Sequence, residues 1–160
     1  MNDNNELTQR VKKIIVEGDY ELLVKYAEQL GEKLAQNLHK NCYNPVKKEG
    51  KKWYCEKCKV FVPDNQVEPA LTTSQIRNIF GFVKQLQARY DPNKLRMLKP
   101  KLAYMQTRSG KGGKALRAVL TTAIDCVFEG EREQQRPRFQ RLVDFFEATL
   151  AYHKAYGGRD

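Results

Sequence analysis

The sequence predicts an all-α protein, a compact bundle of about five helices interrupted by one small insertion. Apolar residues recur at steps of three and four over most of the chain, which is the spacing of amphipathic helices. That period disappears between residues 39 and 67. The 160 residues, of which 41% are hydrophobic and 30% charged, suit a single globular domain. We therefore expect one helical domain over residues 1–160, with residues 39–67 forming the insertion.

Two helices are predicted before the insertion. The first spans residues 5–16 and ends near Gly18. Asp19 then caps a second helix, which runs to the residue before His39. Its apolar stripe consists of Leu23, Ala27, Leu30, Leu34 and Leu38. Residues 1–38 hold seven acidic and five basic residues, so this part suits packing or a protein partner better than a nucleic acid.

The insertion contains two short-spaced pairs of potential metal ligands, His39 with Cys42 and Cys55 with Cys58. Two backbone knuckles of this spacing can complete a tetrahedron of three thiolates and one imidazole, which is a ligand set of structural Zn²⁺. A closed set of four ligands leaves no position for water, so we expect a structural metal in a zinc-knuckle or ribbon-like insertion. For His39 a second interpretation stays open, a histidine at a helix C-terminus that interacts with the last carbonyls.

A third helix is predicted from Thr72, because Thr72 and Gln75 have the capping-box spacing of a helix start. Its apolar side consists of Ile76, Ile79, Phe80, Val83, Leu86 and Tyr90. Another side carries Arg77 and Lys84 around Gly81, where a phosphodiester backbone could come close to the helix. Alternatively, Gly81 accommodates a neighbouring helix.

The next helix begins with an Asp-Pro pair at residues 91–92. Pro100 predicts a break near Leu98 and a restart at the proline. Residues 108–114, RSGKGGK, are predicted to form a flexible basic loop that contacts a nucleic-acid backbone, with a disordered connection as the alternative. They lack the glycine spacing and the Ser or Thr of a nucleotide-binding P-loop. A further helix spans Leu116 to Phe128.

Basic residues are concentrated in residues 71–128, where eleven Lys and Arg stand against only Asp91 and Asp125. Nine of the ten net positive charges of the chain lie there. Amphipathic helices with such unbalanced charge are expected to offer one side to a core and the other to a polyanion. The alternative is a solvated basic face that keeps the protein soluble. Six lysines between Lys47 and Lys59 leave the same two possibilities open for the insertion.

The last helix is predicted to follow a linker, GEREQQRPR, and to open at Pro137. It has two apolar stripes. One consists of Phe139, Leu142, Val143, Phe146 and Leu150, and the other of Phe145, Thr149, Tyr152 and Tyr156. A peripheral helix of a monomer cannot bury both. Either this helix runs through the middle of the bundle, or its second stripe meets another protein.

Three segments together resemble the small helical subunit of type III-A CRISPR effector complexes, the Csm complexes. They are LTTSQIRNIF at 71–80, LKPKLAYM at 98–105 with Arg108 close behind, and LVDFFEATLAYHKAYGGRD at 142–160. The resemblance implies an RNA-binding helical bundle core over residues 71–160. It also implies several copies along a ribonucleoprotein filament, beside the guide RNA and its target RNA, and no catalytic residues. Carried over by position, Arg77 and Arg108 would face RNA.

Charge and resemblance together predict a non-catalytic RNA-binding small subunit that contributes to antiviral defence. Its expected partners are guide RNA, single-stranded target RNA, other Csm complex subunits and copies of itself. The positions expected to contact RNA are Arg77, Lys84, Lys99, Lys101, Arg108, Lys111, Lys114 and Arg117. The alternative function is that of a zinc-containing DNA-binding or transcription-associated factor.

An enzyme is disfavoured because few catalytic side chains are left. The chain has only two histidines, three of its four cysteines are expected to bind the metal, and its basic region holds no pair of acids that could bind a catalytic metal. No apolar run has the length that crossing a membrane requires. The polar start MNDNNELTQR lacks the apolar core of a signal peptide. We therefore expect a cytoplasmic protein.

Overall fold

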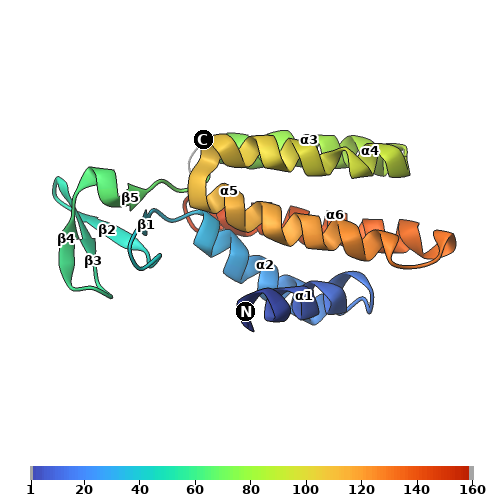
Figure 1. Ribbon diagram of the computed structural model, residues 1–160, viewed down its shortest axis with the longest axis horizontal. Helices are drawn as coiled ribbons and strands as arrows, with labels where there is room; N and C mark the ends of the chain where they lie inside the picture. The colour runs from blue at the N-terminus through green and yellow to red at the C-terminus, as the bar shows by residue number, and fades with distance from the viewer. Residues whose placement is uncertain (1, 159–160) are drawn as a thin grey trace.

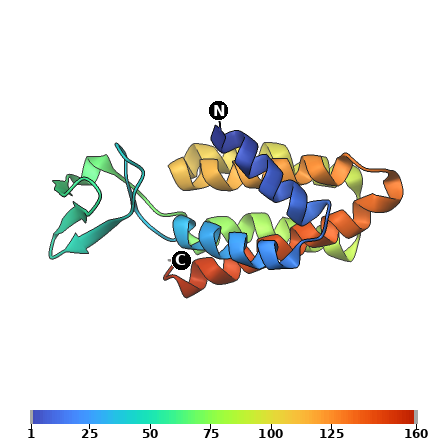
Figure 2. The ribbon, with the colours of Figure 1, turned by 90° about the horizontal axis from the view of Figure 1, so that it is seen from below.

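The computed structural model describes residues 2–158 as a helical bundle with a small β-structured insertion at one end (Figures 1 and 2). The helices are α1 (Asn2–Ile15), α2 (Tyr20–Leu34), α3 (Thr73–Ala88), α4 (Pro92–Arg96), α5 (Leu98–Phe128) and α6 (Arg132–Ala155). The strands are β1 (Leu38–His39), β2 (Val46–Glu49), β3 (Lys52–Cys55), β4 (Val60–Val62) and β5 (Val67–Glu68). Five long helices and the short α4 confirm the predicted fold class, a helical bundle with a cysteine-rich insertion.

Three predicted helix starts, those of α2, α3 and α4, are confirmed by their caps. The Asp19 carboxylate accepts a hydrogen bond from the Leu22 backbone N–H at 3.0 Å. Thr72 and Gln75 form the reciprocal capping box at the start of α3. Asp91 accepts hydrogen bonds from the backbone at the start of α4, where Pro92 occupies the first turn. These side chains satisfy backbone donors that a helix start leaves without partners.

Helix α6 lies in the middle of the bundle and packs against α1, α2, α3 and α5. Both of its apolar stripes therefore contribute to the core. Phe146 stacks on Phe80 of α3 at 5.2 Å between ring centroids, and Phe145 stacks on Tyr26 of α2 at 5.7 Å. Phe145 and Thr149 are buried, whereas Tyr156 is 41% exposed and donates a hydrogen bond to Glu28. The second stripe is thus covered mainly within the chain.

Two predicted helix boundaries are wrong. Helix α2 ends at Leu34, and Leu38 instead begins β1, which pairs with β5 in an antiparallel ladder. The chain leaving the bundle pairs here with the chain returning to it, so backbone hydrogen bonds between strands replace the last helical turn. Helix α6 begins at Arg132 and contains Pro137, because the Glu131–Gln134 capping box starts the helix before the proline. Most of the expected linker is therefore helical.

The expected flexible loop at residues 108–114 is also wrong, because helix α5 continues on both sides of a single break at Gly110. Figure 1 shows the chain reversing direction there, so that α5 forms two arms. Gly110 has a φ of 59° and a ψ of −137°, a conformation that side chains rarely allow. The predicted break near Leu98 is confirmed, because α4 ends at Arg96 and α5 begins at Leu98, two residues before the expected restart at Pro100. The sharp turn at Gly110 was not predicted.

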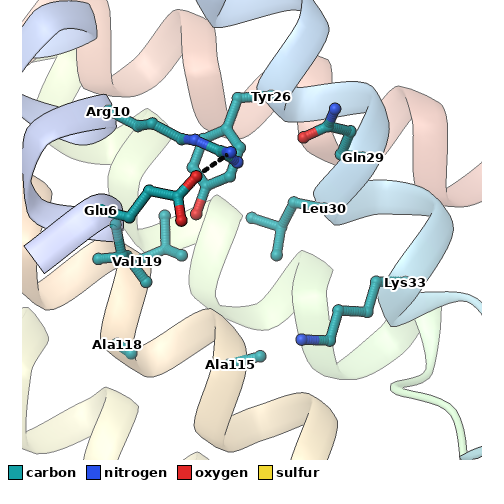
Figure 3. Close-up of a pocket in the computed structure, with 10 residues that line it drawn as sticks. Glu6, Arg10, Tyr26, Gln29, Leu30, Lys33, Ala115, Ala118 and Val119 are labelled. Carbon is teal, nitrogen blue, oxygen red and sulfur yellow. Dashed lines mark hydrogen bonds and ion pairs between the residues drawn. The ribbon is translucent and has the colours of Figure 1, made fainter. Parts of the chain in front are cut away.

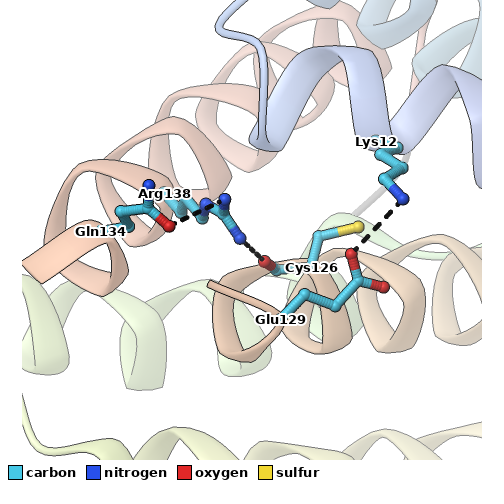
Figure 4. Close-up of polar contacts among 5 residues, drawn as sticks. All are labelled: Lys12, Cys126, Glu129, Gln134 and Arg138. Atoms are coloured by element: carbon cyan, nitrogen blue, oxygen red, sulfur yellow. Dashed lines mark hydrogen bonds and ion pairs between the residues drawn. The ribbon is translucent and has the colours of Figure 1, made fainter. Parts of the chain in front are cut away.

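The opposite end of the bundle, where α5 meets α6, is closed by polar contacts (Figure 4). The guanidinium of the buried Arg138 donates to the Cys126 carbonyl at 2.9 Å and to Gln134 at 3.2 Å. Lys12 of α1 lies 3.8 Å from Glu129 at the end of α5. Cys126 is buried in the core, as expected for a small apolar side chain. None of the described helices combines the length and the hydropathy that a membrane span requires.

Candidate metal centre and basic surface

The insertion brings the four predicted ligands together. The side-chain ligand atoms of His39, Cys42, Cys55 and Cys58 all lie within 4.8 Å of one another. The Cys42 Sγ lies 3.4 Å from His39 Nδ1 and 3.5 Å from Cys55 Sγ. Metal–sulfur bonds of about 2.3 Å in a tetrahedron place two sulfurs about 3.8 Å apart. The cluster therefore has the composition and nearly the spacing of a closed four-ligand metal site.

The two ligand pairs have the same backbone structure. The backbone N–H of Tyr43 donates to the His39 carbonyl at 2.7 Å, and that of Lys59 donates to the Cys55 carbonyl at 2.8 Å. Tyr43 and Lys59 have φ values of 58° and 57° and are the non-glycine residues with positive φ in the described part of the chain. Each follows the second ligand of its pair. His39 thus belongs to a knuckle on β1, so the alternative role at a helix C-terminus is not the one observed.

A three-stranded antiparallel sheet, in the order β2-β3-β4, supports the site. Val46, Cys55 and Val62 form its small core, with Trp53 packed against it. So few apolar side chains stabilise only weakly, since burial of each is worth about 1.5–3 kcal/mol against the entropy of ordering a whole segment. A bound metal would supply the stability that this core lacks.

Hydrogen bonding within the cluster sets the protonation of its thiols. The Asn44 side chain is the largest cause of the lowered pKa of Cys42, which falls to about 6. The hydrogen bond between the Cys58 and Cys42 side chains raises the pKa of Cys58 to about 11. Hydrogen bonding thus favours the thiolate form at Cys42 and disfavours it at Cys58. A thiolate is the form of cysteine that binds metals.

The structure separates the predicted RNA-contacting cations into groups. Arg77 and Lys84 lie on an exposed side of α3, seven residues apart and so on one stripe. A Cβ built on Gly81, between them, would meet no atom within 4 Å, so no neighbouring helix packs there. Lys101 and Arg108 lie instead on the first arm of α5, beside a different side of α3.

Three of the four remaining predicted cations, Lys99, Lys111 and Arg117, have partners within the chain. The half-buried Lys99 is paired with Asp125 and is therefore the least available for RNA. The Lys111 ammonium lies 4.4 Å from the centre of the Tyr43 ring, which joins the second arm of α5 to the metal site. Arg117 donates to the Gln106 side chain at 2.8 Å across the turn of α5. Lys114 is exposed.

Another hollow lies between α1, α2 and α5 (Figure 3). Glu6 is paired there with Arg10, whose guanidinium lies 5.6 Å from the centre of the Tyr26 ring. The hollow thus presents an acid that is already neutralised by a neighbouring base. It brings together none of the predicted site residues.

Reasoning from the sequence missed the aromatic residues beside the cations. Arg108 lies over the Tyr104 ring at 5.0 Å, and Lys101 lies over the Phe82 ring at 4.7 Å. The signal was present for Tyr104, which falls three residues after Lys101 and four before Arg108 and so shares their side of a helix. Phe82 belongs to α3, so its contact with Lys101 of α5 could not be predicted from spacing within one helix.

Comparison with known proteins gives one family. The family model described as Csm2 Type III-A matches residues 63–159. The match begins after the four candidate metal ligands and extends over β5 and α3 to α6. No curated protein and no solved structure matches the chain.

Proposed function

The chain belongs to the Csm2 type III-A family, and on that premise we propose that it is a non-catalytic, RNA-binding small subunit of a type III-A CRISPR effector complex. In this role it lines the guide RNA and the single-stranded target RNA along the ribonucleoprotein and contributes to antiviral defence. The partners are these RNAs, other Csm subunits and further copies of the chain. The protein acts in the cytoplasm.

The observation that best supports RNA binding is the pairing of cations with aromatic rings on an exposed helical surface. Lys101 and Arg108 lie over Phe82 and Tyr104, and neither cation forms an ion pair within the described residues. Positive charge attracts the phosphate backbone regardless of sequence, and exposed rings stack on unpaired bases. This combination favours a single strand. A DNA-binding zinc factor, the second candidate, would instead read base edges of a duplex with a recognition helix.

We propose Zn²⁺ as the metal of the insertion, because three thiolates and one imidazole form a set that zinc prefers. His39, Cys42, Cys55 and Cys58 would hold it through one atom each. The four ligands would fill the tetrahedron, so the metal would stabilise the fold of the insertion without binding water for chemistry.

Copies of the chain are proposed to meet along the RNA and not through α6. Most of the second stripe of α6 is buried within the chain, and the exposed Tyr156 is engaged by Glu28. A repeated RNA site therefore explains several copies better than an apolar contact between free subunits.

Co-purification from the native host tests this function. The chain, tagged at its N-terminus, should retain a short guide RNA, several partner proteins and more than one untagged copy of itself. Nuclease treatment before capture should release the further copies. Recovery of the chain with duplex DNA or transcription proteins, and without guide RNA, would favour the DNA-binding alternative.

A further inference from the structure

A groove of about 570 Å³ runs between α3 and the first arm of α5. Its apolar lining includes Ile79 and Phe82 from α3, and Met97, Tyr104 and Met105 from the other side. Met97 is 57% exposed and Tyr104 is 60% exposed, so packing within the bundle does not account for either side chain. Pockets for small molecules have volumes of about 300–1,000 Å³. The groove is therefore large enough for one nucleotide.

The rim of the groove is positive and carries no acid among its ten lining residues. Lys101 and Arg108, seven residues apart, stand on one side of α5 and form no ion pair with any described residue. Asn78 and Gln75 add amide groups from α3. The Gln75 amide oxygen already accepts the Thr72 backbone N–H at 2.9 Å, which fixes the position of that side chain.

The chemistry of the groove favours a planar, partly apolar ligand that also carries negative charge. An uncharged apolar peptide from a partner protein would use the apolar floor and leave the two cations unpaired. A nucleotide uses both, because its base stacks on aromatic and thioether groups and its phosphate pairs with guanidinium and ammonium groups. The Arg108 guanidinium already lies over the Tyr104 ring, and exposed ring surface remains for a base.

We propose that this groove holds one unstacked base of a single-stranded RNA, stacked on Tyr104, with its phosphate on Lys101 and Arg108. The proposal rests on the proposed RNA-binding function and names the subsite. The base is bound by stacking of its ring on Tyr104 and not by a specific pattern of hydrogen bonds. The groove thus accepts different bases while fixing the position of the strand on the subunit.

The test uses the full chain and an oligouridine that contains a single 2-aminopurine, whose fluorescence falls when the base stacks. Uridines stack weakly on their neighbours, so the free probe is bright. Binding of the wild type should quench it. Tyr104→Ala should abolish the quenching at saturating protein and weaken affinity by roughly 5- to 100-fold, as expected for the loss of one stacked base. Tyr104→Trp should retain both signals.

Two controls make the result specific. Tyr104→Ala should leave the slope of log affinity against log salt unchanged, since stacking releases no counterions, whereas Arg108→Gln should lower the slope by about 0.7. Tyr20→Ala removes another exposed tyrosine, from α2, and should leave affinity and quenching unchanged. Circular dichroism checks that each variant is folded.

The test distinguishes an incorrect assignment of the base site from an incorrect proposed function. If the wild type does not bind single-stranded RNA, the proposed function itself is wrong. If it binds, but Tyr104→Ala changes neither affinity nor quenching, the groove is not a base site while RNA binding stands. If Tyr104→Ala keeps full RNA binding but loses a partner subunit during co-purification, the groove is a protein contact and the proposal is overturned.

Discussion

Glu68 accepts a hydrogen bond from the backbone N–H of Lys111 at 3.0 Å, across 43 residues of sequence. Glu68 ends the chain's return from the insertion, and Lys111 is the first residue after the turn of α5 at Gly110. The carboxylate thus caps the start of the second arm, where a helix favours negative charge. This hydrogen bond links the turn of α5 to the segment that returns from the insertion.

The position of the Glu68 carboxylate beside the turn predicts that substitutions at Glu68 and Gly110 have coupled effects on the free energy of unfolding. A Cβ on Gly110 would lie 1.9 Å from a Glu68 carboxylate oxygen, and the backbone there suits only glycine. Gly110→Ala should therefore lower the free energy of unfolding by about 2–3 kcal/mol, and Glu68→Ala by about 1 kcal/mol. The double variant should be less destabilised than the sum of the two, since the clash is absent when Glu68 is removed. Urea unfolding measures all three. Strict additivity would show that the two residues do not act on each other.

Zinc content follows from the ligand cluster. Elemental analysis of protein purified without a metal-binding tag should find about one zinc per chain. Cys58→Ser should lose zinc and unfold at a lower temperature, because binding of the metal contributes directly to folding of the insertion. Its matched control is Cys126→Ala, which removes the cysteine outside the cluster and should retain the metal. Folded, reduced wild type without zinc would refute the site.

Substitution by alanine should have opposite effects on stability at Gly31 and at Gly81. A Cβ on Gly31 of α2 would lie 2.7 Å from Tyr152 Cβ and 2.8 Å from backbone atoms of α6, whereas a Cβ on Gly81 would meet nothing within 4 Å. Gly31→Ala should destabilise by about 1–3 kcal/mol, because two helices must move apart. Gly81→Ala should stabilise by up to about 1 kcal/mol through helix propensity. Thermal or urea unfolding checks both signs. Equal effects would contradict the close contact of α2 with α6.

His153 predicts an acid-sensitive contribution to stability. Burial is the main cause of its lowered pKa, although a hydrogen bond of 2.7 Å with the Leu71 carbonyl acts in the opposite direction. In acid the unfolded chain binds a proton that the folded chain resists. The contribution of neutral His153 to stability is therefore complete above the pKa of about 6.5 that histidine has in the unfolded chain. It is lost as the pH falls below about 6.5 towards the lowered pKa of His153 in the folded chain.

His153→Gln serves as the comparison, because Gln can still donate to Leu71 but does not titrate. Urea midpoints at several pH values between 7.5 and 5 should fall more steeply with acid for the wild type than for His153→Gln. The metal site and its His39 are present in both proteins, so their effect cancels in the difference. Parallel curves would mean that His153 does not titrate differently in the folded state.

Much of the fold could be predicted because it depends on local signals. Capping residues such as Thr72 with Gln75 act within one turn, and spacing alone brought His39 and Cys42 into one candidate site. The turn at Gly110 could not be placed in the same way, because it is fixed by Glu68 from a distant part of the chain. A glycine-rich basic segment has weak local preferences, so long-range capping decided its structure.

The basic surface was predicted only in part, for a similar reason. Composition located the positive charge in residues 71–128, but not which cations are already paired. Lys99 forms an ion pair with Asp125 from the other arm of α5, and the Lys111 ammonium lies over the Tyr43 ring of the insertion. The groove at Lys101 and Arg108 arises only when α3 packs beside α5. Its residues come from two helices, and periodicity describes one helix at a time.

RNA binding by this surface is tested most directly by the affinity of the purified chain for single-stranded RNA and for duplex DNA, measured over a range of salt concentrations. If the surface binds RNA as proposed, the single strand should bind more tightly than the duplex, with little dependence on sequence and a steep loss of affinity with salt. Lys101→Gln with Arg108→Gln should lower the salt slope for RNA by about 1.4, while Lys25→Gln, in the acidic first part of the chain, should leave it unchanged. Tighter binding of duplex DNA, or an unchanged slope in the folded double variant, would contradict RNA binding by this surface.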